Sequence, residues 1–292
     1  MISIFQLLIP LLAFVLMFIV GTGLSIRDFQ LVASKPRSFA GILFIQITVI
    51  PGIALLLCQF SGLPQPIQIG ILLISICPAG AVSNTYTRLA YGNAALSVAL
   101  TGIASLIALI SMPVLAALLI SSKLDLGASS FYLKVALQLA LFLCLPVCLG
   151  MLVRHKKTDW VNKNNRRFDQ ISIVGIIAII LAALFSHLEL LKTTGLALLG
   201  AALIFTLLMM GLGLLTAKIL KLEPRDGKTI MIEFPVRNLA IAALISISVL
   251  QATDYLLFAA VFALVQGGIM TMVIISSRYS TLKQSKIGGN YC

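Results

Sequence analysis

Long apolar runs that contain few charged residues constrain the fold of this chain most strongly. Each is about 20 residues long, the length of a helix that spans a bilayer, whereas barrel strands are about half as long and alternate with polar residues. The runs cover residues 2–24, 38–60, 67–90, 94–121, 131–153, 170–188, 196–217, 229–252 and 255–277. Charged residues make up 10% of the chain, too few for the surface of a soluble domain. The sequence therefore predicts an all-α polytopic membrane protein with nine transmembrane helices in contact with membrane lipids.

The basic residues favour alternate connections between these runs. Of the 21 Lys and Arg residues, seventeen lie in or next to these connections, Lys123, Lys134 and Lys192 lie in or next to the others, and Arg237 lies well inside a run. Short basic loops stay in the cytoplasm. We therefore expect a multi-pass protein of the cell's inner (plasma) membrane, with the N-terminus outside and the C-terminus cytoplasmic. This topology accounts for the net charge of +12, and no cluster of aromatic and basic residues indicates nucleic-acid binding. The sequence specifies no oligomeric state.

Two charged residues lie inside one apolar run, at Glu233 and Arg237, with Pro235 between them. Their four-residue spacing allows an ion pair on one face of a regular helix. Proline removes a backbone donor and clashes with the preceding turn, so we expect the helix to break here. Such a break is tolerated in a membrane only where it is buried in protein or lines a cavity.

A second interruption is predicted in the run 67–90, where Pro78, Gly80, Ser83 and Asn84 follow Cys77. An asparagine is expected to start the second half-helix after each break, at Asn84 and at Asn238. Two broken helices in corresponding parts of two halves are typical of a transporter site. The sequence thus predicts an inverted repeat made of the second to fourth and the seventh to ninth spans.

Further polar residues lie on neighbouring spans. Ser97 and Thr101 are one turn apart and share a helix face, and Gln46 precedes Pro51 by five residues. Each feature alone is compatible with an ordinary kinked or hydrogen-bonded membrane helix. Their coincidence on four spans favours a binding site. Cys144 and Cys148 also share a face, but no His or carboxylate lies nearby, which favours packing over a metal or redox role.

These blocks resemble the bile acid:sodium symporter family in order and spacing, over essentially the whole chain. The first block is Gly21-Thr22-Gly23-Leu24 followed by Asp28, Phe29 and Pro36, the second is 46–51, the third is 77–84 with 92–97 and Thr101, and the fourth is 233–238. The resemblance implies the family's shorter nine-span form, in which two discontinuous helices cross. It also implies a core domain, approximately 38–121 and 196–277, and a panel domain, approximately 1–24 and 131–188.

The resemblance further implies binding sites. One sodium ion would be held by oxygens of Ser83, Asn84, Ser97, Thr101 and Glu233. A second would use Gln46, Glu233, backbone carbonyls near Phe234 and Val236, and a glutamine. This chain departs from that pattern, because Arg237 stands where the glutamine is expected and Pro235 where a glycine is usual.

A guanidinium is a permanent cation with five donors and no acceptor, so Arg237 cannot ligate sodium and would repel it. We therefore expect one sodium ion, with the second site lost. The predicted function is sodium-coupled symport of a small organic anion, bile-acid-like or a keto or hydroxy acid, by alternating access. The anion would bind beside Ala81 and Asn238, and Arg237 could pair with its carboxylate.

Three alternatives remain open. Transport could be proton-coupled or sodium-independent, with Arg237 replacing the second sodium. A membrane enzyme would need a nucleophile–histidine pair or a metal cluster, and His155 and His187 lie in a loop and near a span end. A sensor would need a signalling domain, which the chain lacks. The sequence therefore predicts a transporter and no enzyme.

Overall fold

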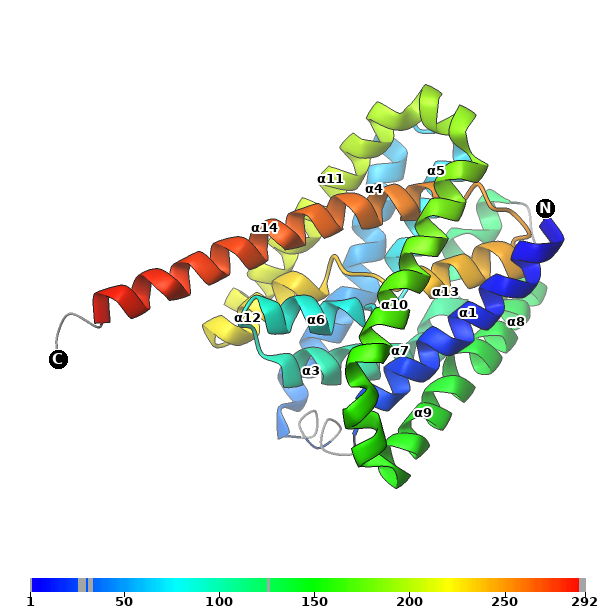
Figure 1. Cartoon of the computed structure of the whole chain (residues 1–292). Coiled ribbons are helices and arrows are strands. Elements are labelled where there is room, and N and C mark those ends of the chain that lie inside the picture. The colour runs from blue at the N-terminus through cyan, green and yellow to red at the C-terminus, as the bar shows by residue number, and fades with distance from the viewer. Residues whose placement is uncertain (1, 26–29, 31–33, 125–126, 289–292) are drawn as a thin grey trace.

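The computed structural model describes residues 2–25, 30, 34–124 and 127–288, which are mostly helical (Figure 1). The elements are α1 (Ile2–Gly23), α3 (Pro36–Phe44), η1 (Ile45–Val49), α4 (Ile50–Phe60), α5 (Gln65–Ile76), α6 (Val82–Leu89), α7 (Ala94–Leu119), η2 (Ser121–Lys123), α8 (Ala128–Leu139), η3 (Ala140–Cys144), α9 (Leu145–Lys156), α10 (Thr158–Ser186), α11 (Leu188–Ile219), α12 (Pro224–Glu233), α13 (Leu239–Leu244), η4 (Ile245–Val249) and α14 (Leu256–Gly288). Arg27, Asp28 and Phe29 lie outside the described residues, as do the side chains of Lys283 and Lys286 in the basic tail.

Within the described residues, six helices are long and apolar enough to cross a membrane. They are Pro36–Phe60, Ala94–Leu119, Ser129–Lys156, Thr158–Ser186, Leu188–Ile219 and Leu256–Tyr279. Three apolar helices are shorter, Leu8–Gly23, Gln65–Ile76 and Leu239–Val249, and these fall in the first, third and eighth predicted runs. The structure thus bears out a multi-span helical protein. The count of nine spans remains a prediction, because these three helices are too short to meet the same criterion.

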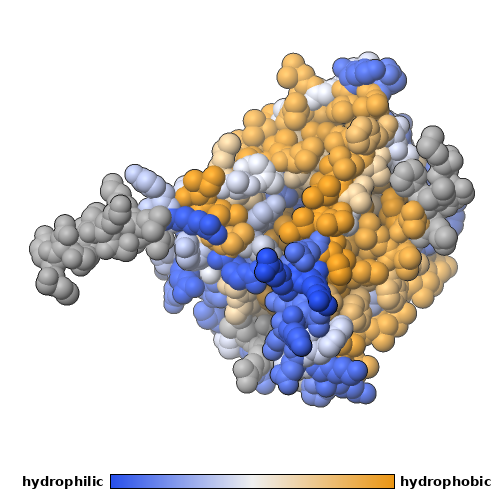
Figure 2. Space-filling model, in the orientation of Figure 1, coloured by the Kyte–Doolittle hydropathy of each residue, from blue (hydrophilic) through white to orange (hydrophobic). Residues whose placement is uncertain are grey.

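The surface carries a broad apolar area that is bounded by polar residues. Figure 2 shows hydrophobic residues over much of the visible face, with hydrophilic residues gathered at the lower end and in a smaller group at the top. Large apolar side chains are strongly exposed, as at Phe60 (85%) and Leu196 (88%). An apolar area of this extent suits contact with lipid rather than water.

Two of the long helices contain a turn of π-helix just before a proline. Residues Ile45–Val49 (η1) precede Pro51, and Ala140–Cys144 (η3) precede Pro146. A proline ring clashes with the carbonyl four residues earlier, and a wider turn moves that carbonyl away. The first of these turns holds Gln46, which is buried.

Helix α1 packs against α9 and α10. The approach of α1 to α9 requires a small residue, because a Cβ atom at Gly150 would lie 2.2 Å from the carbonyl oxygen of Phe18. Elsewhere, α11 packs against α12 and α14, and α4 packs against α5. The first group belongs to the predicted panel and the second to the predicted core. The division into domains remains a prediction.

Candidate functional site

Both predicted interruptions are present. Helix α5 ends at Ile76 and α6 begins at Val82, while α12 ends at Glu233 and α13 begins at Leu239. Pro78 and Pro235 lie within the two breaks. Each proline removes one backbone donor, so the neighbouring backbone groups need partners outside their own helix.

The two breaks cross and satisfy each other. The N–H of Gly80 donates to the carbonyl of Val236 at 2.9 Å, and the N–H of Asn238 donates to the carbonyl of Pro78 at 2.9 Å. Ala79 and Arg237 form an antiparallel bridge between these bonds. The close approach explains the glycine, because a Cβ atom at residue 80 would lie 2.9 Å from the carbonyl oxygen of Arg237. We refer to residues 78–80 and 236–238 as the crossing.

The helix starts after the breaks differ from expectation at one position. The side chain of Asn238 caps α13 by accepting from the N–H of Ile241 at 3.2 Å, as predicted. Asn84 makes no such cap, since α6 begins two residues earlier at Val82. The amide oxygen of Asn84 instead lies 2.8 Å from the hydroxyl oxygen of Ser97.

Glu233 is the centre of a buried polar cluster beside the crossing. Its side chain is fully buried, and its Oε2 accepts from the hydroxyl of Ser97 at 2.8 Å while Oε1 accepts from that of Thr101 at 2.5 Å. The hydroxyls of Ser83 and Thr101 lie 3.3 Å apart. Together with the amide oxygen of Asn84, these are the five residues proposed from the sequence to hold sodium. They come from α6, α7 and α12. Apart from the amide nitrogen of Asn84, all polar atoms of their side chains are oxygens.

Arg237 forms no ion pair with Glu233 within the described part of the chain. The helix on which their four-residue spacing would bring them together ends at Glu233, so the ion pair that the spacing allowed does not form. Instead, Nη1 of Arg237 donates to the carbonyl of Cys77 at 3.1 Å, and its Nε and Nη2 have no hydrogen-bond partner.

The other residues named for a second ion are not joined into one cluster. The carbonyl of Val236 accepts the crossing bond from Gly80, and Phe234 is buried. Gln46 is 4% exposed, and both polar atoms of its amide lack a hydrogen-bond partner. No hydrogen bond therefore links Gln46 to the crossing.

A cavity of about 370 Å³ lies against the crossing, between α1, α10 and α14. Ala81, Arg237 and Asn238, the residues proposed from the sequence to bind substrate, all line it. Most of the remaining wall is apolar and comes from α1, α10 and α14, with Leu16 on α1 and Ile173 and Ile176 on α10.

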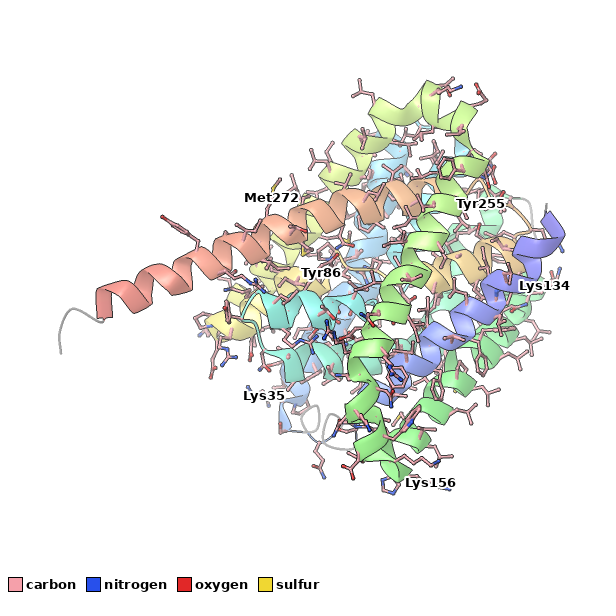
Figure 3. The ribbon with its side chains drawn as sticks, in the orientation of Figure 1. Lys35, Tyr86, Lys134, Lys156, Tyr255 and Met272 are labelled. Carbon is pink, nitrogen blue, oxygen red and sulfur yellow. The ribbon has the colours of Figure 1, made fainter. Side chains whose placement is uncertain are left out.

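Four polar residues of the cavity wall were not singled out from the sequence. They are Tyr86 on α6 (labelled in Figure 3), Ser172 on α10, and Gln266 and Thr271 on α14. The hydroxyl of Tyr86 lies near Gly267, and the amide nitrogen of Gln266 has no hydrogen-bond partner. Gln266 is a polar residue inside the last apolar run, and this is the sequence signal that could have identified it.

The two cysteines of the predicted packing pair have their sulfur atoms 4.0 Å apart. Both thiols are free. The part of the chain that the structure describes holds no group of three His, Cys, Asp or Glu side chains that could bind a metal ion.

Comparison with known proteins gives the same family as the sequence motifs. The model of the Sodium Bile acid symporter family matches residues 10–194, a segment that ends before α12. The uncharacterized sodium-dependent transporter YocS of Bacillus subtilis is 32% identical over 229 residues, which are 78% of this chain and 70% of that protein.

More distant relatives are cotransporters of plants and mammals. The probable sodium/metabolite cotransporter BASS1 of Arabidopsis thaliana is 29% identical over 75% of this chain and 53% of its own length. The human ileal sodium/bile acid cotransporter is 30% identical over 60% of this chain and 49% of its own. The chain thus aligns with about half the length of these two. On the family match and the similarity to the bacterial transporter, the chain belongs to the sodium bile acid symporter family.

Proposed function

We propose that this protein is a secondary active transporter that couples sodium entry to the uptake of a small organic anion. Membership of a family of sodium-dependent transporters supports the coupling ion. The observation that carries the proposal is the oxygen cluster around Glu233, which lies directly beside the crossing of two broken helices.

The chemistry of the cluster suits sodium. A small hard cation prefers oxygen ligands, and a carboxylate with hydroxyl and amide oxygens provides them. Ser97 and Thr101 now direct their hydroxyl protons at Glu233. Rotation of those hydroxyls would turn their lone pairs toward an ion, and the ion would neutralise a carboxylate that is otherwise buried with its charge uncompensated.

One sodium ion per cycle is proposed, because Arg237 supplies a permanent positive charge at the crossing. Its guanidinium donates to the carbonyl of Cys77, a backbone oxygen of the kind that freed carbonyls offer to cations in broken helices. A second sodium ion using Gln46, Phe234 and Val236 would be repelled by this charge. The alternative is proton-coupled or sodium-independent transport with the same arginine in place of the ion.

The anion would bind in the cavity lined by Ala81, Arg237 and Asn238. The cavity lies between α1 and α10 of the proposed panel (1–24 and 131–188) and α14 and the crossing of the proposed core (38–121 and 196–277). Movement of the panel against the core would expose it to each side in turn.

The orientation proposed for the membrane places the N-terminus outside and the C-terminus in the cytoplasm of a cell with this protein in its plasma membrane. In Figure 3, Lys35 and Lys156 lie toward the lower end of the molecule and Lys134 lies away from them on the right. Lys35 and Lys156 belong to the lysine- and arginine-rich connections, which supports a cytoplasmic lower end.

The test is a sodium titration of the purified protein, with choline as the replacement cation. We expect sodium to raise the melting temperature of the wild type and to have no effect on Glu233→Gln, because the amide removes the charge that the ion neutralises. The titration should follow a Hill slope near one. A slope near two would contradict the single ion, and an unresponsive wild type would contradict sodium coupling and favour the alternative.

A further inference from the structure

A second buried carboxylate, that of Asp226, lies at the start of α12, the helix that ends at Glu233. Asp226 is 5% exposed. Its Oδ1 accepts a hydrogen bond from Nδ2 of Asn93 at 2.8 Å, and its Oδ2 lies 3.8 Å from the ammonium of Lys35. A buried carboxylate is costly unless it is hydrogen-bonded, and the partner that Asp226 has within hydrogen-bond distance is the amide of Asn93.

Asn93 is the residue that starts α7. Its Oδ1 accepts from the N–H of Leu96 at 3.2 Å and so caps the helix. Its own N–H donates to the hydroxyl of Thr229 at 2.8 Å. The side-chain oxygen of Asn93 is thus used for α7, and the side-chain nitrogen is used for Asp226. The carboxylate therefore orients the amide that holds the first turn of α7.

Two tiers of polar contacts join α7 to α12. In the first tier Asn93 donates to Thr229, and in the second Ser97 donates to Glu233. The step between the tiers is four residues on each helix, or about 6 Å along the helix axis. The equal steps mean that the two helices run in the same direction and in register. A displacement at the first tier is therefore passed to the second.

The turn between α6 and α7 also lies closely against α12. Nζ of Lys228 donates to the carbonyl of Ala90 at 3.1 Å. A Cβ atom at Gly92 would lie 3.0 Å from the hydroxyl oxygen of Thr229. Closely packed interiors transmit small shifts and do not absorb them. The start of α7 is therefore held by α12 from several directions, with Asp226 bound to its capping residue.

We infer that Asp226 is a positioning residue for the sodium site, acting through its hydrogen bond to Asn93. That bond sets the register of α7 and thereby the positions of the Ser97 and Thr101 hydroxyls relative to Glu233. The inference rests on the proposed function, in which these hydroxyls bind sodium. Groups that orient metal ligands act in this way without touching the ion, and the loss of one typically lowers metal affinity about 10–100-fold.

The experiment is a sodium titration of the melting temperature of the purified protein, with choline as the replacement cation. Asp226→Ala should raise the sodium concentration at half-maximal stabilisation about tenfold. Asp226→Asn keeps an oxygen that can accept from Asn93, so it should recover most of this loss. The matched control is Glu223→Ala, which removes an exposed carboxylate from the same end of α12 and should leave the sodium response unchanged.

Two outcomes of this titration overturn the inference. If Asp226→Asn loses as much as Asp226→Ala, the charge acts and not the hydrogen bond. If Glu223→Ala loses as much as Asp226→Ala, any negative charge at this end of α12 has the same effect.

Asn93→Ser tests the same bond from its other side, and it decides the question if Asp226→Ala does not melt cooperatively. Serine can still cap α7, but it lacks the amide nitrogen that binds Asp226. We expect the same loss of about tenfold in sodium affinity. Adding Asp226→Ala to this variant should cost little more, because both changes remove one bond. Sodium affinity equal to that of the wild type in Asn93→Ser overturns the inference.

Lithium distinguishes positioning from general support of the fold. Selectivity between cations depends on cavity size, ligand number and flexibility. A loosened site should fit the smaller ion differently, so the ratio of the half-maximal lithium and sodium concentrations should change severalfold in Asp226→Ala. A ratio equal to that of the wild type, with both concentrations raised, overturns the positioning role.

Hydrogen exchange in sodium-free buffer separates this inference from the proposed function. The backbone N–H groups of Leu96 and Ser97, which bond to Asn93, should exchange faster in Asp226→Ala than in the wild type or in Glu223→Ala. Unchanged exchange in a protein that responds to sodium refutes the role of Asp226 alone. A wild type that ignores sodium, with faster exchange in Asp226→Ala, refutes the sodium coupling alone.

Discussion

At the scale of single residues, Glu233 is a fully buried carboxylate whose hydrogen-bond donors are hydroxyl groups and not an arginine. Hydroxyls can donate or accept, so the same side chains can hold the carboxylate or turn their oxygens to an ion. A site built in this way responds to a cation without large movement of its helices. The hydroxyl of Thr101 is therefore a proposed sodium ligand as well as a hydrogen-bond donor to Glu233.

Thr101→Val tests this role, because it keeps the shape of the side chain and removes its oxygen. We expect the sodium concentration at half-maximal stabilisation to rise about tenfold, the effect of losing roughly 1.4 kcal/mol of binding free energy. Sodium titration of the melting temperature measures it. Thr206→Val is the matched control, since Thr206 is also fully buried but donates only to Ala202 in its own helix. Equal sodium responses in the two variants would contradict the prediction.

Residue spacing predicted part of this site, and the packed structure was needed for the rest. Ser97 and Thr101 are one turn apart, and their shared face does meet one carboxylate. The predicted start of the second half-helix at Asn84 was wrong, because the helix that follows the break at Pro78 can begin at any of several residues, and α6 begins at Val82. The sequence did not identify Tyr86, Ser172, Gln266 or Thr271, because a lone polar residue in an apolar run does not reveal which neighbour its face meets.

At the scale of elements, the crossing depends on how closely two backbones can approach. The bonds from Gly80 to Val236 and from Asn238 to Pro78 hold residues from distant parts of the sequence together. The position of a missing Cβ atom at Gly80, 2.9 Å from a carbonyl oxygen, leaves no room for a side chain. The contact between Gly80 and Arg237 therefore fixes the position of both broken helices relative to each other.

Gly80→Ala should separate the two backbones at this point. We expect a loss of stability of about 1–3 kcal/mol, typical of an added methyl group in a packed interior, and a weaker sodium response. The melting temperature with and without sodium measures both. Gly200→Ala on α11 is the control, because nothing lies within 4 Å of its Cβ position, and alanine there should be neutral or slightly stabilising. A Gly80→Ala protein that matches this control would contradict the account of the crossing.

Hydropathy located the helices but not their ends. The sixth run was predicted to start at residue 170, whereas α10 starts at Thr158, and α14 continues to Gly288, beyond the predicted end at 277. The added turns of α10 contain Lys163, Arg166 and Arg167, which have good helix propensity but do not suit lipid. An apolar run marks the part of a helix that suits lipid, while hydrogen bonding and propensity determine where the helix stops.

At the scale of the whole molecule, α10 makes polar contacts to distant elements from within the helix and just after its C-terminal end. Asp169 pairs with Arg88 of α6 at 3.4 Å, and the ring Nε2 of His187, just after α10, lies 3.0 Å from the hydroxyl of Thr253, just before α14. The ion pair is largely exposed, and exposed pairs contribute about 0–1 kcal/mol. Contacts this weak can break and re-form as one part of the protein moves against another.

We expect sodium binding to move α10 against the crossing and so to change access to the cavity. With the native cysteines replaced, a cysteine at Ser172 should react with N-ethylmaleimide at a rate that changes severalfold on sodium addition, because residue 172 lines the cavity. Asn165→Cys is the control, since Asn165 is exposed on the same helix and does not line the cavity, and its rate should stay constant. A Ser172→Cys rate that ignores sodium would contradict movement of α10 against the crossing.

The short stretch from Glu233 to Asn238 connects the oxygen cluster, which contains its first residue, with the cavity, which is lined by its last. In the proposed function, an ion in the oxygen cluster and an anion in the cavity would each change the free energy of binding the other. Such linkage is reciprocal: whatever factor sodium contributed to the affinity for the anion, the anion would return to the affinity for sodium. The six residues at this single crossing would then let the gradient of one solute concentrate another.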